Sequence, residues 1–205
     1  MNLNVFAKEV HRNAVEHGWW ETERDPLEII ALIHSEWSEA LEEFRAGRPM
    51  IWFECADGVE AALQGCGING VCEETHLCAY RKSKPEGIAV ELIDGCIRIL
   101  DLIGYIGIEL KNGDYGELTN TIRRVYKFKN IKQLPFPMFI THCHFMTAKA
   151  GESHSQLREM VSFLEVTIGQ VFCWIEEQGL NPKDLMIQKH EYNKTRPYRH
   201  GNKVC

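Results

Sequence analysis

The sequence predicts an all-α protein that folds as one compact helical bundle. Three observations favour this fold class. Apolar residues recur at helical spacing in several segments, residues typical of helix starts and stops flank these segments, and no alternating strand pattern of useful length appears. A chain of 205 residues is long enough to bury a real core.

The first strongly predicted helix begins at Pro26 and ends before Gly47. Asp25 is a typical N-cap, proline suits the first helical position, and Glu28 adds an acid in the first turn. Pro49 follows just beyond the end. One apolar face runs along this segment, through Ile30, Ile33, Trp37, Leu41 and Phe44, so Trp37 is expected in the core.

Residues 50–83 are rich in glycine and cysteine and predict at most a short helix at 56–64. The C-x5-C-x5-C spacing is not that of a structural zinc site, whose cysteines come in pairs two to four apart. Without a secretory signal, free thiols are expected. The cysteines of this insert are Cys55, Cys66, Cys72 and Cys78. Cys96 and Cys173 fall in apolar helical segments, where cysteine acts as a small hydrophobic residue.

A second long helix is predicted from Pro85 and Glu86 to about Leu110. Its apolar face is wide and includes Ile88, Leu92, Ile93, Cys96, Ile99, Leu100, Ile103 and Ile106. A polar row at steps of three and four runs beside that face and consists of Glu91, Asp94, Arg98 and Asp101. We interpret Arg98 as balancing the charge of this row.

Four further helices follow. Residues 115–131 predict a basic amphipathic helix, and two more are expected at 138–149 and 155–178. Ser153-x-x-Gln156 resembles a capping box for the second of these, which should end at Gly179. The last helix begins with Asn181 and Pro182 as cap and first residue.

A weak internal repeat relates two predicted helical hairpins. The segment IHSEWSEALEEFRAG aligns with ITHCHFMTAKAG, and the helix after each aligns as well. In this alignment Glu91 corresponds to Phe163 and Asp94 to Val166. The second copy therefore keeps the spacing of the apolar residues but lacks the acids.

The repeat predicts a tandem, pseudo-dimeric arrangement within one compact domain. Residues 1–132 would form a catalytic helical half. Residues 133–205 would form a degenerate, structural half that also carries a basic tail.

Charge and hydropathy exclude several classes of protein. The net charge is −6 with acids and bases mixed, so nothing indicates nucleic-acid binding. The most apolar helix carries four charged residues and is not expected to span a membrane. The start, MNLNVFAKEV, is too polar for a signal peptide, so we expect a cytoplasmic protein.

Two acidic motifs lie on the two long helices, Glu36-x-x-Glu39 and Glu91-x-x-Asp94. Residues three apart share a helix face, so each pair aims two carboxylates at one point. Carboxylates that meet in a partly dry seam repel one another unless a cation neutralises them. Oxygen ligands of this kind suit Mg²⁺ or Mn²⁺. The alternative is that both pairs are solvated edges of amphipathic helices.

The C-terminal tail adds groups that suit a nucleotide. Lys189 offers a point charge, and Arg196 and Arg199 can grip phosphate in a fork. Tyr192 can stack on a base. The alternative is an ordinary basic extension.

Three blocks together resemble the MazG-like all-α nucleoside triphosphate pyrophosphohydrolases. They are ALIHSEWSEALEEFRAGRP, KPEGIAVELIDGCIRILDLIG and KHEYNKTRPYRHGNK, and they cover about a quarter of the chain. The resemblance implies hydrolysis of an NTP or dNTP to the monophosphate and pyrophosphate with Mg²⁺ or Mn²⁺. It implies that Lys189 and Asn193 contact phosphate or sugar, and that the metal ligands are Glu36, Glu39, Glu91 and Asp94.

One departure from the family pattern concerns the first motif. Many members have two adjacent acids at its start, whereas this chain has Ser35 in the first position. Either Glu42 or Glu43 substitutes, or the site holds fewer metals.

The sequence does not determine the base or the sugar of the nucleotide, and it allows a homodimer. The alternative is a non-catalytic helical protein of the same descent that binds nucleotide or serves in oligomerisation. A carboxylate-bridged metal oxidase would need Glu-x-x-His pairs on its helices, and the predicted helices of the first half carry none.

Overall fold

The computed structural model describes residues 1–54, 60–62, 84–125 and 134–199. These residues are mostly helical, which confirms the all-α prediction, and they form seven helices with three short strands. The helices are α1 (Leu3–Glu16), α2 (Pro26–Arg45), α4 (Ile88–Ile106), α5 (Tyr115–Val125), α6 (Phe136–Glu152), α7 (Leu157–Glu177) and α8 (Pro182–Lys194). The strands are β1 (Trp52–Glu54), β2 (Glu60–Ala62) and β3 (Lys84–Glu86).

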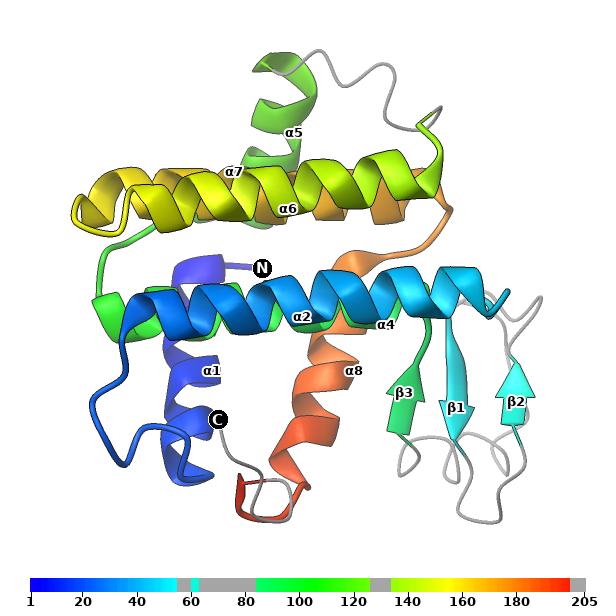
Figure 1. Cartoon of the computed structure of the whole chain (residues 1–205), viewed down its shortest axis with the longest axis horizontal. Coiled ribbons are helices and arrows are strands. Elements are labelled where there is room, and N and C mark those ends of the chain that lie inside the picture. The colour runs from blue at the N-terminus through cyan, green and yellow to red at the C-terminus, as the bar shows by residue number, and fades with distance from the viewer. Residues whose placement is uncertain (55–59, 63–83, 126–133, 200–205) are drawn as a thin grey trace.

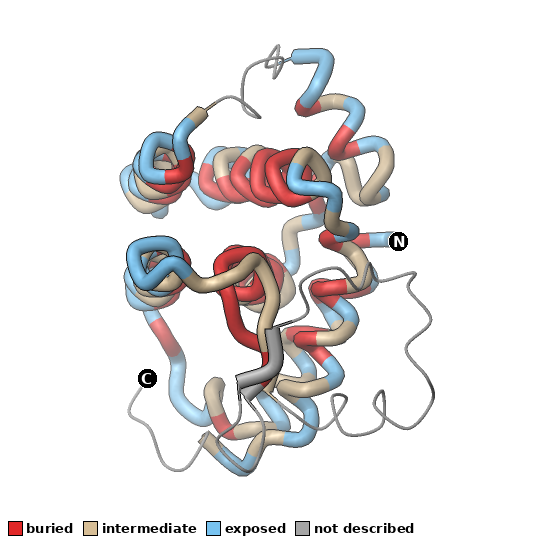
Figure 2. The backbone as a smooth tube through the Cα atoms, turned by 90° about the vertical axis from the view of Figure 1, so that its right-hand side faces the viewer, coloured by how far each residue is buried: buried red, intermediate tan, exposed pale blue. Residues whose placement is uncertain are grey.

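The four longest helices form two stacked layers (Figure 1). Helices α2 and α4 make one layer, helices α6 and α7 make the other, and α2 packs against α6. Helix α4 is central because it contacts α1, α2, α7 and α8. Buried residues concentrate along the inner helices of both layers (Figure 2), and α4 and α7 contribute most to the core.

Helix α2 forms as the sequence predicts. The Asp25 side chain accepts a hydrogen bond from the Leu27 backbone N–H at 2.8 Å, and Pro26 occupies the first turn. The chain turns away after Arg45 through Gly47, whose φ of 68° lies in the left-handed region. Trp37 is fully buried, as predicted.

Helix α4 begins at Ile88, two residues after the predicted Pro85–Glu86 start. Residues Lys84–Glu86 are instead strand β3, which pairs antiparallel with β1. Gly87 then makes the sharp transition with a φ of 110°, and a Cβ there would lie only 2.8 Å from the Met50 carbonyl oxygen. The strands were missed because their pairing joins distant residues and each is only three residues long.

Three other local predictions differ from the structure. Helix α1 was not predicted, although Asn2 caps it by accepting from the Val5 N–H at 3.0 Å. Residues 60–62 of the expected short helix at 56–64 form strand β2, and the rest of that segment lies outside the described residues. The capping-box prediction is wrong, because Ser153 ends α6 and Gln156 makes no side-chain cap bond to α7.

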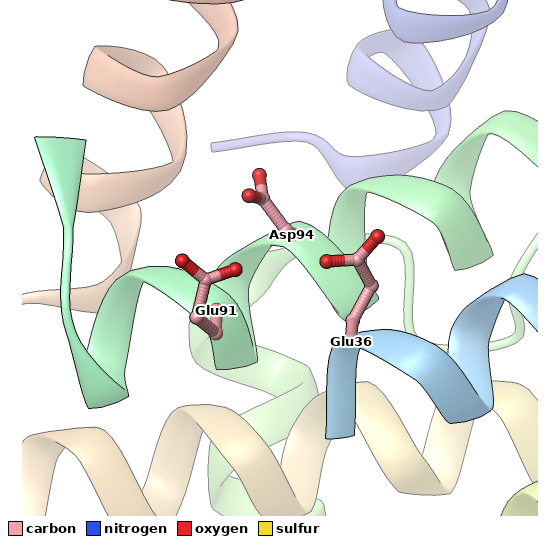
Figure 3. Close-up of side chains that lie close together, drawn as sticks. All are labelled: Glu36, Glu91 and Asp94. Carbon is pink, nitrogen blue, oxygen red and sulfur yellow. The ribbon is translucent and has the colours of Figure 1, made fainter. Parts of the chain in front are cut away.

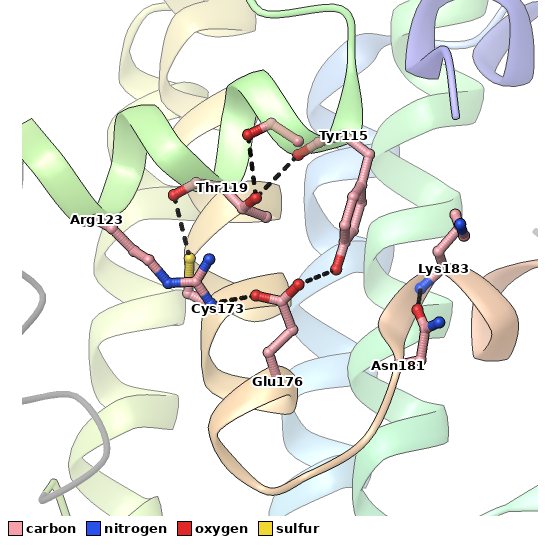
Figure 4. A network of polar contacts seen from close by, with 8 residues as sticks. Tyr115, Thr119, Arg123, Cys173, Glu176, Asn181 and Lys183 are labelled. Atoms are coloured by element: carbon pink, nitrogen blue, oxygen red, sulfur yellow. Dashed lines mark hydrogen bonds and ion pairs between the residues drawn. The ribbon is translucent and has the colours of Figure 1, made fainter. Parts of the chain in front are cut away.

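Helix α5 is fixed to α7 through one acidic side chain (Figure 4). The Tyr115 hydroxyl donates to Glu176, whose other carboxylate oxygen pairs with Arg123. The Cys173 thiol lies 3.7 Å from the Thr119 carbonyl oxygen in the same contact. The basic charge predicted for this segment therefore has a structural partner at Arg123, and residues 126–131 lie outside the described part.

The described cysteines are free thiols, in agreement with the sequence. Cys96, Cys143 and Cys173 are buried and unpaired. Cys55, Cys66, Cys72 and Cys78 lie outside the described residues. Within the described ranges, no helix is both long enough and apolar enough to cross a membrane.

The seam between α2 and α6 carries two polar contacts across antiparallel helices (Figure 1). The Trp37 indole N–H donates to the Thr147 hydroxyl at 2.9 Å. The Nδ1 atoms of His34 and His144 lie 2.8 Å apart. Since burial lowers the pKa of both histidines, they are neutral at pH 7 and one ring donates to the other.

This histidine pair should make the fold sensitive to mild acid. A histidine whose pKa is lowered by folding contributes stability above its unfolded pKa, near 6.5, and this contribution is lost as the pH falls. Between pH 7.5 and pH 5.5, wild type should therefore lose more unfolding free energy than His144→Phe does. Urea unfolding at both pH values measures this, and a difference between the proteins that stays constant with pH would contradict it.

Candidate functional site

Three of the four predicted acidic side chains meet at one point (Figure 3). Glu36 comes from α2, while Glu91 and Asp94 lie on consecutive turns of α4. One carboxylate oxygen of each lies within 4.8 Å of the others. The i,i+3 spacing of the sequence motif puts the α4 pair on one face, and packing of α2 against α4 adds the third. We call these three residues the carboxylate cluster.

Close approach of α2 to α4 depends on a glycine. A Cβ at Gly95 would overlap the Trp37 indole, so only glycine lets this ring lie against the α4 backbone. Glu36 precedes Trp37 directly and is carried to the cluster by the same contact. The two acidic motifs therefore lie close together because Trp37 packs against Gly95, not because of the acidic residues themselves.

Glu39, the fourth predicted acid, is not part of the cluster. It is exposed on α2 and lines the cavity in front of the cluster. Glu39 is nevertheless near enough for its charge to help raise the pKa of Glu36.

Burial and mutual repulsion disfavour the charged forms of two members of the cluster. Glu36 is 4% exposed, and burial with the nearby Asp94 charge raises its pKa to about 7 despite the opposing Arg98. Glu91 is 5% exposed, and burial with the Asp94 charge and a hydrogen bond to Glu86 raises its pKa to about 9. The cluster is therefore short of positive charge.

Two basic side chains already contact the cluster. Arg98 donates from Nε to Glu36, in keeping with the charge-balancing role that the sequence indicates. The Lys189 Nζ lies 2.8 Å from Asp94 Oδ2 and donates to the Pro85 carbonyl at 3.1 Å. Lys189 is 2% exposed, so its charge is buried together with the acids.

A cavity of about 210 Å³ opens in front of the cluster. Its walls come from α1, the α1–α2 connection, α2, β3, α4 and α8. Besides the cluster, its charged and polar lining residues include Asn13, His17, Arg24, Glu39, Lys84, Arg98, Asp101, Lys189, His190, Asn193 and Arg196.

The tail enters this cavity only in part. Lys189, Asn193 and Arg196 follow one face of α8 and its extension, and all three line the cavity. Tyr192 is not among the lining residues, and its ring lies 6.0 Å from the Lys189 Nζ. Arg199 also lies outside the lining, because the chain returns to the α1–α2 connection before reaching it.

Arg199 is fully engaged in that connection. Its backbone N–H donates to the His17 carbonyl at 3.0 Å, and its Nε donates to the Gly18 carbonyl at 3.1 Å. Its guanidinium also lies 3.0 Å from Glu21. The predicted phosphate fork of Arg196 and Arg199 is therefore not assembled in this structure.

Sequence reasoning missed the residues that α1 and the α1–α2 connection contribute. Asp101, which lines the cavity, is held by the Trp20 indole at 3.0 Å and by His11 Nδ1 at 2.8 Å. Arg24 is buried, lines the same cavity and pairs with Glu28 at 2.9 Å. The signal available for Asp101 was its place in the polar row of α4.

The cluster fits a divalent cation on chemical grounds. It offers only carboxylate oxygens, which Mg²⁺ and Mn²⁺ prefer, and the raised pKa values of Glu36 and Glu91 indicate a need for positive charge. Beside it, Asn193 Oδ1 and His190 Nδ1 are buried without a hydrogen-bond partner, whereas His190 Nε2 lies 3.4 Å from Glu9 Oε1. Unsatisfied polar atoms in a cavity wall are typical of a ligand site.

Comparison of the chain with models of protein families, with curated proteins and with solved structures gave no match.

Proposed function

We propose that this protein hydrolyses a nucleoside triphosphate, either NTP or dNTP, to the monophosphate and pyrophosphate with Mg²⁺ or Mn²⁺. The observation that supports this most is the meeting of the carboxylate cluster with Lys189, Asn193 and Arg196 in one cavity. Carboxylates alone repel a triphosphate, whereas a cation held by them together with nearby basic groups attracts it.

The chain's residues divide into three roles. Glu36, Glu91 and Asp94 would hold the cation, which when bound stabilises charge on phosphoryl oxygens and lowers the pKa of a water. Glu39 keeps an exposed carboxylate at the cavity wall, where it would accept the proton of the attacking water. Arg196 would bind the phosphates of the substrate.

We also propose the MazG-like, tandem form of the fold. The α2–α4 and α6–α7 hairpins pack as two antiparallel layers (Figure 1), and α4 and α7 are each followed by a left-handed glycine, Gly107 and Gly179. The counterparts of Glu91 and Asp94 are Phe163 and Val166, which pack against the core. Residues 1–132 would thus be the catalytic half and 133–205 the degenerate half with the tail.

One observation favours a second candidate, a non-catalytic nucleotide-binding or oligomerisation protein of the same descent. Arg98 and Lys189 already pair with members of the cluster, as they would in a protein that uses these acids only for structure.

Hydrolysis of triphosphates labelled in the γ-phosphate separates these functions. We expect the label in pyrophosphate, because the inner phosphates are expected to lie at the carboxylate cluster, so that attack occurs away from the terminal phosphate. A mixture of NTPs and dNTPs with Mg²⁺ is the substrate, and a reaction with EDTA is the control. Label in orthophosphate would indicate a different hydrolase, and no turnover with any triphosphate would favour the non-catalytic candidate.

A further inference from the structure

Two basic side chains contact carboxylates that would hold a metal ion. The ammonium of Lys189 lies 2.8 Å from Asp94 Oδ2, and the Arg98 guanidinium donates to Glu36 Oε1. Both are charge-assisted contacts; the one made by Lys189 is buried, whereas Arg98 reaches buried Glu36 from a partly exposed position. Both side chains also line the cavity in front of the cluster.

We propose that Lys189 and Arg98 are displaceable counter-ions, which leave the carboxylate cluster when a divalent cation binds and then contact the phosphates of the substrate. This inference rests on the proposed function, and it adds an exchange of partners that couples cation binding to triphosphate binding.

The charges of the site favour such an exchange. The Lys189 ammonium and the Arg98 guanidinium contact the carboxylates that would hold a divalent cation, so all three positive groups would lie a few ångströms apart and repel one another strongly. The exchange would also free Asp94 Oδ2 and Glu36 Oε1, which Lys189 and Arg98 now use, so that the cation could take both oxygens of each carboxylate. Both basic groups are therefore driven toward the cavity.

The cavity provides a new position or hydrogen-bond acceptor for each displaced basic group. Asn193 lies one turn after Lys189 on α8, and its buried Oδ1 has no hydrogen-bond partner in the present arrangement. That acceptor suits an ammonium released from Asp94. The side chain of Arg98 is 40% exposed, so it can swing toward the cavity without breaking core packing. A triphosphate would supply the remaining acceptors.

The exchange makes the two ligands cooperative. The cation alone must overcome two internal ion pairs, whereas in the presence of triphosphate the released groups gain new partners. By linkage, triphosphate should tighten cation binding by the same factor by which the cation tightens triphosphate binding.

Titration of the metal-free protein with Mn²⁺, followed by the electron paramagnetic resonance of free Mn²⁺, tests this without any turnover. Lys189→Met removes one internal cation and should tighten Mn²⁺ binding roughly tenfold or more. Arg98→Met should act in the same direction. Lys194→Met is the matched control, because it changes a lysine of the same helix that pairs with Glu9 and Glu191 away from the cluster, so its Mn²⁺ affinity should equal wild type.

Circular dichroism checks that each variant is folded, and Arg98→Met carries the test if Lys189→Met does not fold. Unchanged or weaker Mn²⁺ binding by the folded variants, with measurable binding by wild type, would overturn the counter-ion role and leave the proposed function standing. Absence of Mn²⁺ binding in wild type and variants alike, even with a non-hydrolysable triphosphate, would instead overturn the proposed function.

Discussion

Replacing Asp94 with asparagine should lower the rate of pyrophosphate release by more than about 100-fold, since loss of a residue that merely supports a metal ligand already costs about 10–100-fold. Asp94 is the central member of the cluster, because its charge raises the pKa values of both Glu36 and Glu91 and its Oδ2 holds Lys189. The measurement is kcat/KM with saturating Mg²⁺, and activity near wild type would remove Asp94 from the site.

The structure changes the expected stability of such variants. From the sequence alone, replacing Glu39 or Asp94 with alanine should relieve repulsion and leave the fold intact or more heat-stable. Lys189 is buried 2.8 Å from Asp94, however, so Asp94→Ala leaves a buried ammonium without its carboxylate. Breaking a buried pair in this way typically costs about 3–5 kcal/mol, so this variant should be less stable than wild type.

Glu91→Gln is the matched comparison within the same cluster. Its pKa of about 9 means that Glu91 is protonated at pH 7 in the metal-free protein, and glutamine keeps that neutral form and its size. The metal-free variant should therefore unfold at the wild-type temperature or above, although its activity should fall as far as that of Asp94→Asn. A loss of stability equal to that of Asp94→Ala would contradict the protonated assignment.

Features that depend on local sequence patterns were predicted correctly. The cap and proline of α2, the apolar face of α4 and the i,i+3 pairing of Glu91 with Asp94 depend on residues within a few turns of one another, and all of them are confirmed. Membership of Glu36 in the same cluster needed one further assumption, that the two acidic helices pack together.

Contacts between distant segments could not be predicted in this way. The Lys189 ammonium meets Asp94 and the Pro85 carbonyl only because α8 crosses α4 about a hundred residues later in the chain. Strand β3 replaced the predicted first turn of α4 for the same reason, because its partner is β1. The return of the tail to the α1–α2 connection depends on contacts of Arg199 with His17, Gly18 and Glu21, which lie far earlier in the chain.

The tail therefore offers a paired test of its two arginines. Arg196 lines the cavity, whereas Arg199 is held by carbonyl groups of the α1–α2 connection and by Glu21. Arg196→Met should raise KM for the triphosphate by about 10- to 100-fold, because a charge-assisted hydrogen bond to phosphate contributes about 1.5–3 kcal/mol. Steady-state kinetics with Mg²⁺ measure this.

Arg199→Met should affect stability and leave substrate binding unchanged. Its KM should stay near wild type, while its unfolding temperature should fall, because the two side-chain contacts of Arg199 with Gly18 and Glu21 are lost. Deleting all residues after Glu191 would combine both losses, since it removes Asn193 and Arg196 from the cavity and Lys194 from Glu9. If Arg199→Met raised KM as strongly as Arg196→Met did, the tail would have to rearrange around the substrate and bring both arginines to the phosphates.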